Sequence, residues 1–214
     1  MKTLMLTENW AQSLMPKGIA IPSATIISGE GGSGKPLVEL AVVAHWLKSG
    51  GKAIGIPLQY PNAAFVEDAL QKLYGLELSA YSQQHVHVQF DPESTEAHPI
   101  GPNEIRANLL EPSQWDQVSR LGTDMLQGTD ENTLIYGAAL NLLLFSPTYK
   151  EKVLDKIDAL LQDGSPRSYM FSVSTSAMRE DIRRWEETAD NLWFTEMDKE
   201  KRLFFRVEKL KGLP

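Results

Sequence analysis

The sequence of 214 residues contains no cysteine. Disulfide bonds, thiolate metal ligands and cysteine nucleophiles are therefore all excluded. Long hydrophobic runs are missing as well, because no apolar stretch reaches the length needed to cross a bilayer. Residues 1–8 show neither the apolar core nor the cleavage pattern of a targeting segment. We therefore expect a cytoplasmic protein with no membrane partner.

Positive charge is also scarce. Lysine and arginine together number 21 against 28 aspartates and glutamates, which gives a formal net charge of −7. An acidic chain has no bulk positive field to attract DNA or RNA, so we do not expect nucleic acid as the main partner. The length suits one sizeable hydrophobic core. We predict a single domain over residues 1–214, of which residues 1–22 form a lead-in segment with a short helix and then a loop.

Glycine, in contrast, is concentrated in the stretch ATIISGEGGSGKP at residues 24–36. Its apolar, β-branched beginning predicts a buried strand, and the apolar residues 37–47 predict a helix after the loop. A strand, Gly-x-x-x-x-Gly-Lys and a helix together form the P-loop arrangement that cradles phosphates. The predicted nucleotide-binding residues are Gly29, Glu30, Gly31, Gly32, Ser33, Gly34, Lys35 and Pro36.

The P-loop pattern departs from its usual form at one position. Glycines let the backbone point its N–H groups inward, and Lys35 would supply a positive charge for the β- and γ-phosphates. The pattern then requires Ser or Thr, whose hydroxyl binds Mg²⁺, but Pro36 stands there. We expect that ATP or ADP could bind, whereas the sequence gives no support for magnesium. The plainer alternative is a glycine-rich turn that only connects a strand to a helix.

Strands and helices alternate along the rest of the chain. This order predicts a three-layer α/β fold with a mainly parallel twisted sheet, to which a final hairpin adds antiparallel strands at one edge. Residues 91–112 carry four prolines and predict a long surface excursion, with a helix possible at residues 103–110. The other expected strands cover residues 52–58, 85–90, 133–137, 167–173, 191–196 and 202–207; the helices cover 8–14, 62–73, 115–126, 149–161 and 178–189.

This pattern resembles the RecA-like P-loop ATPases, and within them the single-domain KaiC-like proteins. Residues 18–22, Gly-Ile-Ala-Ile-Pro, are similar to that family's approach to its first strand. Residues 49–52, Ser-Gly-Gly-Lys, resemble its step into the second strand, and residues 206–212 resemble its closing Val-x-Lys-x-Arg-Gly strand. The resemblance implies a RecA-like fold that covers nearly the whole chain.

Carried over residue by residue, the resemblance implies losses at three positions of the hydrolytic site. The magnesium hydroxyl is replaced by Pro36, and the pair of glutamates that polarise water matches Gln59 and Tyr60. The Walker B aspartate falls at Gly137, beside Tyr136 and Ala138, which are no substitutes. Because metal, base and phosphate contacts each contribute orders of magnitude in rate, we expect no efficient ATP hydrolysis.

The family also implies a contact between subunits. Its closing strand carries Lys-x-Arg, which reaches the γ-phosphate of a neighbouring subunit, and Lys209 and Lys211 occupy these positions. The alternative is that both are solvated charges on an edge strand, where lysine opposes aggregation. The resemblance thus implies a nucleotide-binding or structural subunit that assembles with itself or with a related active ATPase. Two other functions stay open: an atypical ATPase that uses Glu30 or Glu39, and a DNA-associated recombinase paralogue.

Other side chains give weaker signals. His85 and His87 have strand spacing and could bind a metal with Asp91 or His98, but two histidines without an acidic cluster are typical of ordinary surface residues. Trp115, Trp185 and Trp193 are expected to serve in packing. Ser172, Ser174 and Ser176 lack the partners of a nucleophile. We predict no catalytic residue and no metal site.

Overall fold

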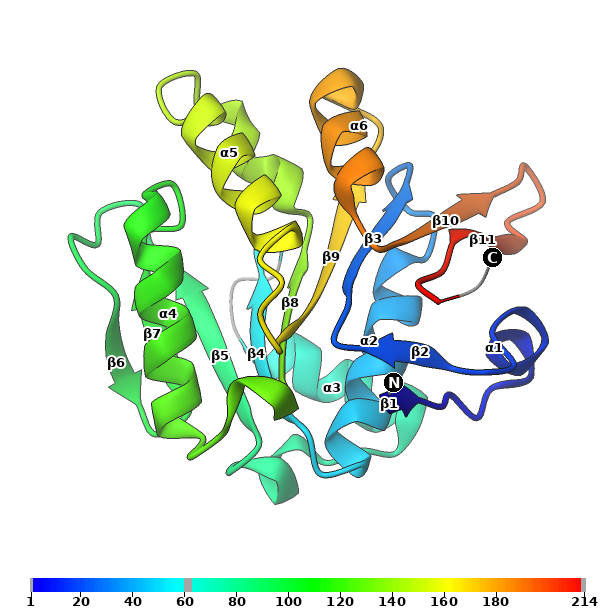
Figure 1. Ribbon diagram of the computed structural model, residues 1–214, viewed down its shortest axis with the longest axis horizontal. Coiled ribbons are helices and arrows are strands. Elements are labelled where there is room, and N and C mark those ends of the chain that lie inside the picture. The colour runs from blue at the N-terminus through cyan, green and yellow to red at the C-terminus, as the bar shows by residue number, and fades with distance from the viewer. Residues whose placement is uncertain (1, 60–62, 213–214) are drawn as a thin grey trace.

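The computed structural model describes residues 2–59 and 63–212 (Figure 1). In this part of the chain a nine-stranded sheet has the order β11-β10-β3-β9-β8-β4-β5-β7-β6, and β1 pairs with β2 separately. All neighbours in the large sheet run parallel except the edge strands β11 and β6. The strands are β1 Lys2–Leu4, β2 Ile19–Ile21, β3 Ala24–Gly29, β4 Lys52–Pro57, β5 His85–Phe90, β6 His98–Gly101, β7 Glu104–Ala107, β8 Thr133–Ala138, β9 Ser168–Ser174, β10 Asn191–Met197 and β11 Leu203–Lys209.

Helices cover both faces of the sheet, so the molecule has three layers. One core lies between the sheet and α1, α2 and α3, and the other between the sheet and α4, α5 and α6. Figure 1 shows the second group in front of the strands. The α-helices are α1 Asn9–Leu14, α2 Lys35–Lys48, α3 Ala63–Tyr74, α4 Pro112–Met125, α5 Lys150–Leu161 and α6 Arg179–Thr188, and the 3₁₀ helices are η1 Leu78–Tyr81, η2 Asp130–Asn132 and η3 Leu140–Phe145.

The strands and helices that were predicted occur in the predicted order, with shifts of at most three residues at their ends, apart from the corrections below. The three tryptophans expected in packing are indeed buried: Trp115 is 3% exposed, and Trp185 and Trp193 are fully buried. Strands of a parallel sheet that is covered on both faces have continuous apolar sequences. This pattern allowed β3, β4 and β8 to be predicted from the sequence. Among the residues described, no helix is both long and apolar enough to span a bilayer.

Three local expectations were wrong. Within the expected helix at residues 103–110, Glu104–Ala107 forms the strand β7 instead, in which the buried side chains of Ile105 and Ala107 alternate with half-buried ones. The lead-in is not a loop between its helix and Pro22, because Ile19–Ile21 forms the buried strand β2. The last hairpin adds only one antiparallel strand, β11, because β10 runs parallel to β3.

The expectation of surface histidines was also wrong. His85 is 3% exposed and His87 is 4% exposed, because β7 and β6 extend the sheet beyond β5 and leave β5 away from the edge. His85 Nε2 lies 2.8 Å from the Tyr136 hydroxyl, which crosses above Gly55 of the intervening strand β4. The alternative of a metal site finds no support, since no group of three suitable ligands occurs within residues 2–59 and 63–212.

Candidate phosphate-binding site

The glycine-rich loop lies where three parallel strands end. Gly29, the last residue of β3, is paired with Ser174 of β9 on one side and with Thr195 of β10 on the other. Figure 1 shows the loop above the arrowhead of β3. Open α/β sheets bind ligands outside the carboxyl ends of their strands. The fold therefore places the loop at the edge of the sheet where a ligand site is expected.

The loop backbone requires glycine at defined positions. Gly32 has φ of 78° and Gly34 has φ of 84°, in the left-handed region that side chains disfavour. At Gly29 a Cβ atom would lie 2.3 Å from the Thr195 carbonyl oxygen, so the neighbouring strand leaves no space for a side chain. The glycine-rich sequence thus shapes a compact loop before α2.

Lys35 is the cation of this loop, and its side chain folds back over the backbone. Its Nζ donates to the carbonyl oxygens of Gly29 at 2.8 Å and Glu30 at 2.5 Å. Burial lowers the pKa of Lys35 to about 8, against the opposing influence of the Glu30 and Glu39 carboxylates. A phosphate beside Nζ would favour the charged ammonium and would compete with these carbonyl oxygens.

Backbone N–H groups add to the positive potential at the start of α2. Within the described residues, the N–H groups of Gly32, Gly34 and Lys35 have no hydrogen-bond acceptor, whereas the Gly31 N–H donates to Ser176 Oγ at 3.0 Å. The first N–H groups of a helix carry a partial positive charge and can bind an anion. Lys35 and these glycines all line the same side of the loop.

This side of the loop opens into a cavity of about 720 Å³. The volume lies within the range of about 300–1,000 Å³ that is typical of small-molecule sites. Lys35 is the one charged residue in the described wall, which contains no aspartate or glutamate. The lining residues are Gly31, Gly32, Ser33, Gly34, Lys35, Pro36, Leu37, Gln59, Ala139, Asn141, Leu142, Phe145, Ser174, Ser176 and Ala177.

The positions to which the resemblance assigns metal and water offer little to either. Pro36 is the second residue of α2 and has neither a hydroxyl nor an N–H group. At Gly137 a Cβ would lie 3.0 Å from Leu140 Cδ2 and 3.2 Å from the Ile56 carbonyl oxygen, so the site is filled by its neighbours. Gln59 lines the cavity, and Tyr60 lies outside the described residues.

Neither Glu30 nor Glu39, the two candidate replacement carboxylates, lines the cavity. Glu30 is exposed on the outside of the loop. Glu39 is 2% exposed, accepts a hydrogen bond from Ser172, and has one carboxyl oxygen, Oε2, without a partner in the described structure. Burial raises the pKa of Glu39 to about 8, so the carboxyl group is largely protonated at neutral pH.

The protonated state of Glu39 leads to a prediction about stability. Its pKa is higher in the folded chain than the usual 4.5, so between these values the folded state binds more protons than the unfolded state. Its contribution to stability is present below about pH 4.5 and is lost as the pH rises through about 8. Glu39→Gln should therefore stabilise the protein at about pH 8 by about 1 kcal/mol or more, and much less at about pH 5.

Urea denaturation of the variant and the wild type at both pH values measures this difference. Glu30→Gln serves as a matched control because it makes the same substitution at an exposed position, in the glycine-rich loop before α2. Destabilisation of Glu39→Gln at the higher pH would show that the fold depends on an ionised carboxylate at this position, which would contradict a neutral Glu39.

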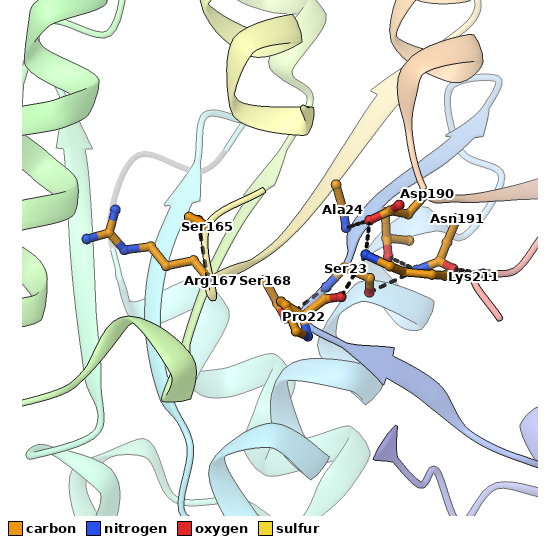
Figure 2. Close-up of polar contacts among 10 residues, drawn as sticks. Pro22, Ser23, Ala24, Ser165, Arg167, Ser168, Asp190, Asn191 and Lys211 are labelled. Carbon is orange, nitrogen blue, oxygen red and sulfur yellow. Dashed lines mark hydrogen bonds and ion pairs between the residues drawn. The ribbon is translucent and has the colours of Figure 1, made fainter. Parts of the chain in front are cut away.

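Lys211 lies far from the glycine-rich loop of its own chain. Lys211 Nζ binds Asp190 at 3.0 Å and the Pro22 carbonyl oxygen at 3.1 Å, and the same carboxylate accepts the Ala24 N–H (Figure 2). Ala24 is the first residue of β3, whereas the loop follows the last residue of this strand. The two ends of β3 are about 17 Å apart. Only a second subunit could therefore bring its loop to Lys211.

Lys209 also has partners within the chain. Its Nζ donates to the carbonyl oxygens of Glu186 at 3.2 Å and Glu187 at 2.9 Å in the last turn of α6. A cation at this end of a helix is favourable because the helix dipole is negative there. The contact of both lysines with a neighbouring phosphate stays a prediction, but neither is a purely solvated charge.

Three contacts that support the loop were missed at the sequence level. Ser176 binds the Gly31 N–H, Thr195 Oγ1 lies 2.7 Å from Ser33 Oγ, and the Asn141 carboxamide oxygen accepts the Ser174 N–H at 2.9 Å. All three connect segments more than 30 residues apart, and none belongs to a recognisable motif. Only the alignment of the strand ends brings these residues together.

A three-layer fold with a mainly parallel sheet and a Gly-x-x-x-x-Gly-Lys loop after the interior strand β3 defines the class of P-loop α/β folds. A KaiC-like protein from the hyperthermophilic archaeon Pyrococcus horikoshii has the same fold, with a TM-score of 0.74. The similarity covers 99% of this chain and 90% of the other at 9% sequence identity. No family model and no curated protein matches the sequence. The predicted KaiC-like, RecA-type fold is thus confirmed.

Proposed function

We propose that the protein is a KaiC-like P-loop domain that binds the phosphates of ATP or ADP without hydrolysing ATP efficiently. Its role would be that of a nucleotide-responsive or structural subunit in an assembly. The observation that carries this proposal is the charge of the cavity at the loop. Its described wall combines one lysine and helix N-terminal amides with a complete lack of carboxylates.

The residues present fit a phosphate group. Lys35 and the N–H groups of Gly32 and Gly34 would hold its oxygens, in the manner of an oriented set of backbone donors with a point charge. Magnesium does not fit this site, because the ion is usually held through carboxylates, the described wall contains none, and Pro36 lacks the hydroxyl of the usual metal-binding position.

A role in assembly rests on the resemblance to KaiC-like proteins and on the apolar rim of the cavity. Leu37 is 39% exposed, Leu142 is 45% exposed and Phe145 is 57% exposed, and all three line the cavity. Exposed apolar side chains around a polar site are typical of contact surfaces. The proposed partner is a second copy or a related active ATPase, with residues 1–214 acting as one domain.

Steady-state ATP hydrolysis by the purified chain tests this function. We expect no turnover above the background of the assay, and no gain when Mg²⁺ is added, because the described wall has no carboxylate to hold the ion or to accept a proton from water. Addition of single-stranded DNA should not change this result. Magnesium-dependent turnover that Lys35→Ala abolishes would instead establish the atypical ATPase.

A further inference from the structure

A second cavity, of about 280 Å³, lies on the side of the sheet where α3 and η1 pack against β5 and β7. Its lining shares no residue with the cavity at the glycine-rich loop. In the sheet, β5 is four strand positions from β3, which corresponds to about 19 Å. The described lining consists of Ala63, Glu67, Leu78, Ser79, His85, His87, Pro102, Asn103 and Glu104.

The charge of this second cavity is opposite to that of the first. Glu67 of α3 and Glu104 of β7 contribute two carboxylates, and no lysine or arginine is present in the described lining. Ser79 and Asn103 add uncharged polar groups. An anion would be repelled here, and a cation would find two opposite charges from different elements of the fold.

The two histidines of the cavity are buried and neutral. Burial lowers the pKa of His85 to about 3 and also lowers the pKa of His87, for which the Glu104 carboxylate is a weaker opposing influence. A neutral imidazole keeps one nitrogen that accepts a hydrogen bond. His85 contacts Tyr136, but the Nδ1 of His87, a side chain only 4% exposed, has no partner in the described structure.

An unpartnered nitrogen at such depth is costly in a protein interior, and it is often the sign of a missing ligand or water. His87 and Glu104 are register partners on adjacent strands, so an acceptor nitrogen and a carboxylate lie side by side. Together they match a ligand group that has both positive charge and N–H donors.

We propose that this cavity binds a small organic cation with N–H donors, such as a primary ammonium group. Glu67 and Glu104 provide the opposite charge, and His87 accepts a hydrogen bond from the ligand. A metal ion is a poorer match, because no three suitable ligands converge within the described residues. The small volume restricts the ligand to a short chain or a single ring.

Titration of the full chain with putrescine, followed through the ring NMR signals of His85 and His87, tests the proposal. We expect saturable shifts of the His87 signals, and none with butanediol, which has the same length but no charge. Glu104→Gln should weaken putrescine binding about tenfold, because it removes a charged hydrogen-bond partner. Glu131→Gln should leave binding unchanged, since it removes an equal charge at an exposed position outside the cavity.

Ser79→Phe provides a second variant that does not depend on charge. Ser79 is an exposed residue of η1, so the larger side chain should block the cavity without unfolding the protein. Equal responses to putrescine and butanediol, equal affinity in Glu104→Gln, a response to Zn²⁺ alone, or unchanged signals at millimolar putrescine would each overturn the proposal. Because ATP is absent from the titration, its outcome is independent of the proposed nucleotide site.

Discussion

Gly29→Ala is expected to destabilise the protein by about 3 kcal/mol and to abolish phosphate binding. The added methyl group would lie 2.3 Å from the Thr195 carbonyl oxygen and 2.6 Å from Ser33 Oγ. The first of these atoms belongs to the backbone of β10, so the clash cannot be relieved by a rotamer change. Relief requires β10 to move away from β3, which disturbs the sheet directly below the loop.

Thermal denaturation measures this effect. For a chain of this size, about 3 kcal/mol corresponds to a decrease of about 6–12 °C in Tm. The matched control is Gly31→Ala, two residues further on, where a Cβ would meet only Ser176 Oγ at 3.7 Å. We expect the control to stay within about 0.5 kcal/mol of the wild type. Similar Tm values for the two variants would contradict the described packing of the loop.

Lys35→Ala is expected to weaken ATP and ADP binding by about 10- to 100-fold. Lys35 is the one cation in the described wall of the cavity, and hydrogen bonds to charged groups contribute about 1.5–3 kcal/mol each. Stability should change little by comparison, because the substitution also removes a desolvated ammonium group.

The control for Lys35→Ala is Lys199→Ala, which removes the same charge from the exposed turn between β10 and β11. Calorimetric titration of both variants with ADP gives the comparison. If the two variants lose affinity to the same extent, then the effect reflects net charge, and the loop is a connecting turn rather than a phosphate site.

The sequence was sufficient for the main elements of the fold and for the position of the loop. Residues 24–36 contain a strand, a glycine-rich loop and a helix start, and each of these is specified by neighbours along the chain. The alternation of residue types with a period of two likewise predicted the strand β5 at His85–Phe90, with the same bounds as in the structure. These sequence patterns depend only on residues that are near one another in the chain, so they can be interpreted without knowledge of the tertiary structure.

The errors came from features that depend on strand order. Residues 91–112 look irregular because of their prolines, yet β6 and β7 formed there continue the sheet and bury His85 and His87. The support of the loop by Ser176 follows from the alignment of β3 with β9, which no motif encodes. The contact between Tyr136 and His85 needs a glycine at position 55 on the strand between them.

Calorimetric titration of the wild-type chain with ADP and ATP, in EDTA and again in Mg²⁺, tests directly whether the loop holds phosphate without a metal ion. We predict saturable binding in EDTA and an affinity that Mg²⁺ does not improve, because the loop and Lys35 hold phosphate while the described cavity wall has no carboxylate to hold the metal ion. Binding that appears only with Mg²⁺, or no binding of either nucleotide, would contradict this prediction.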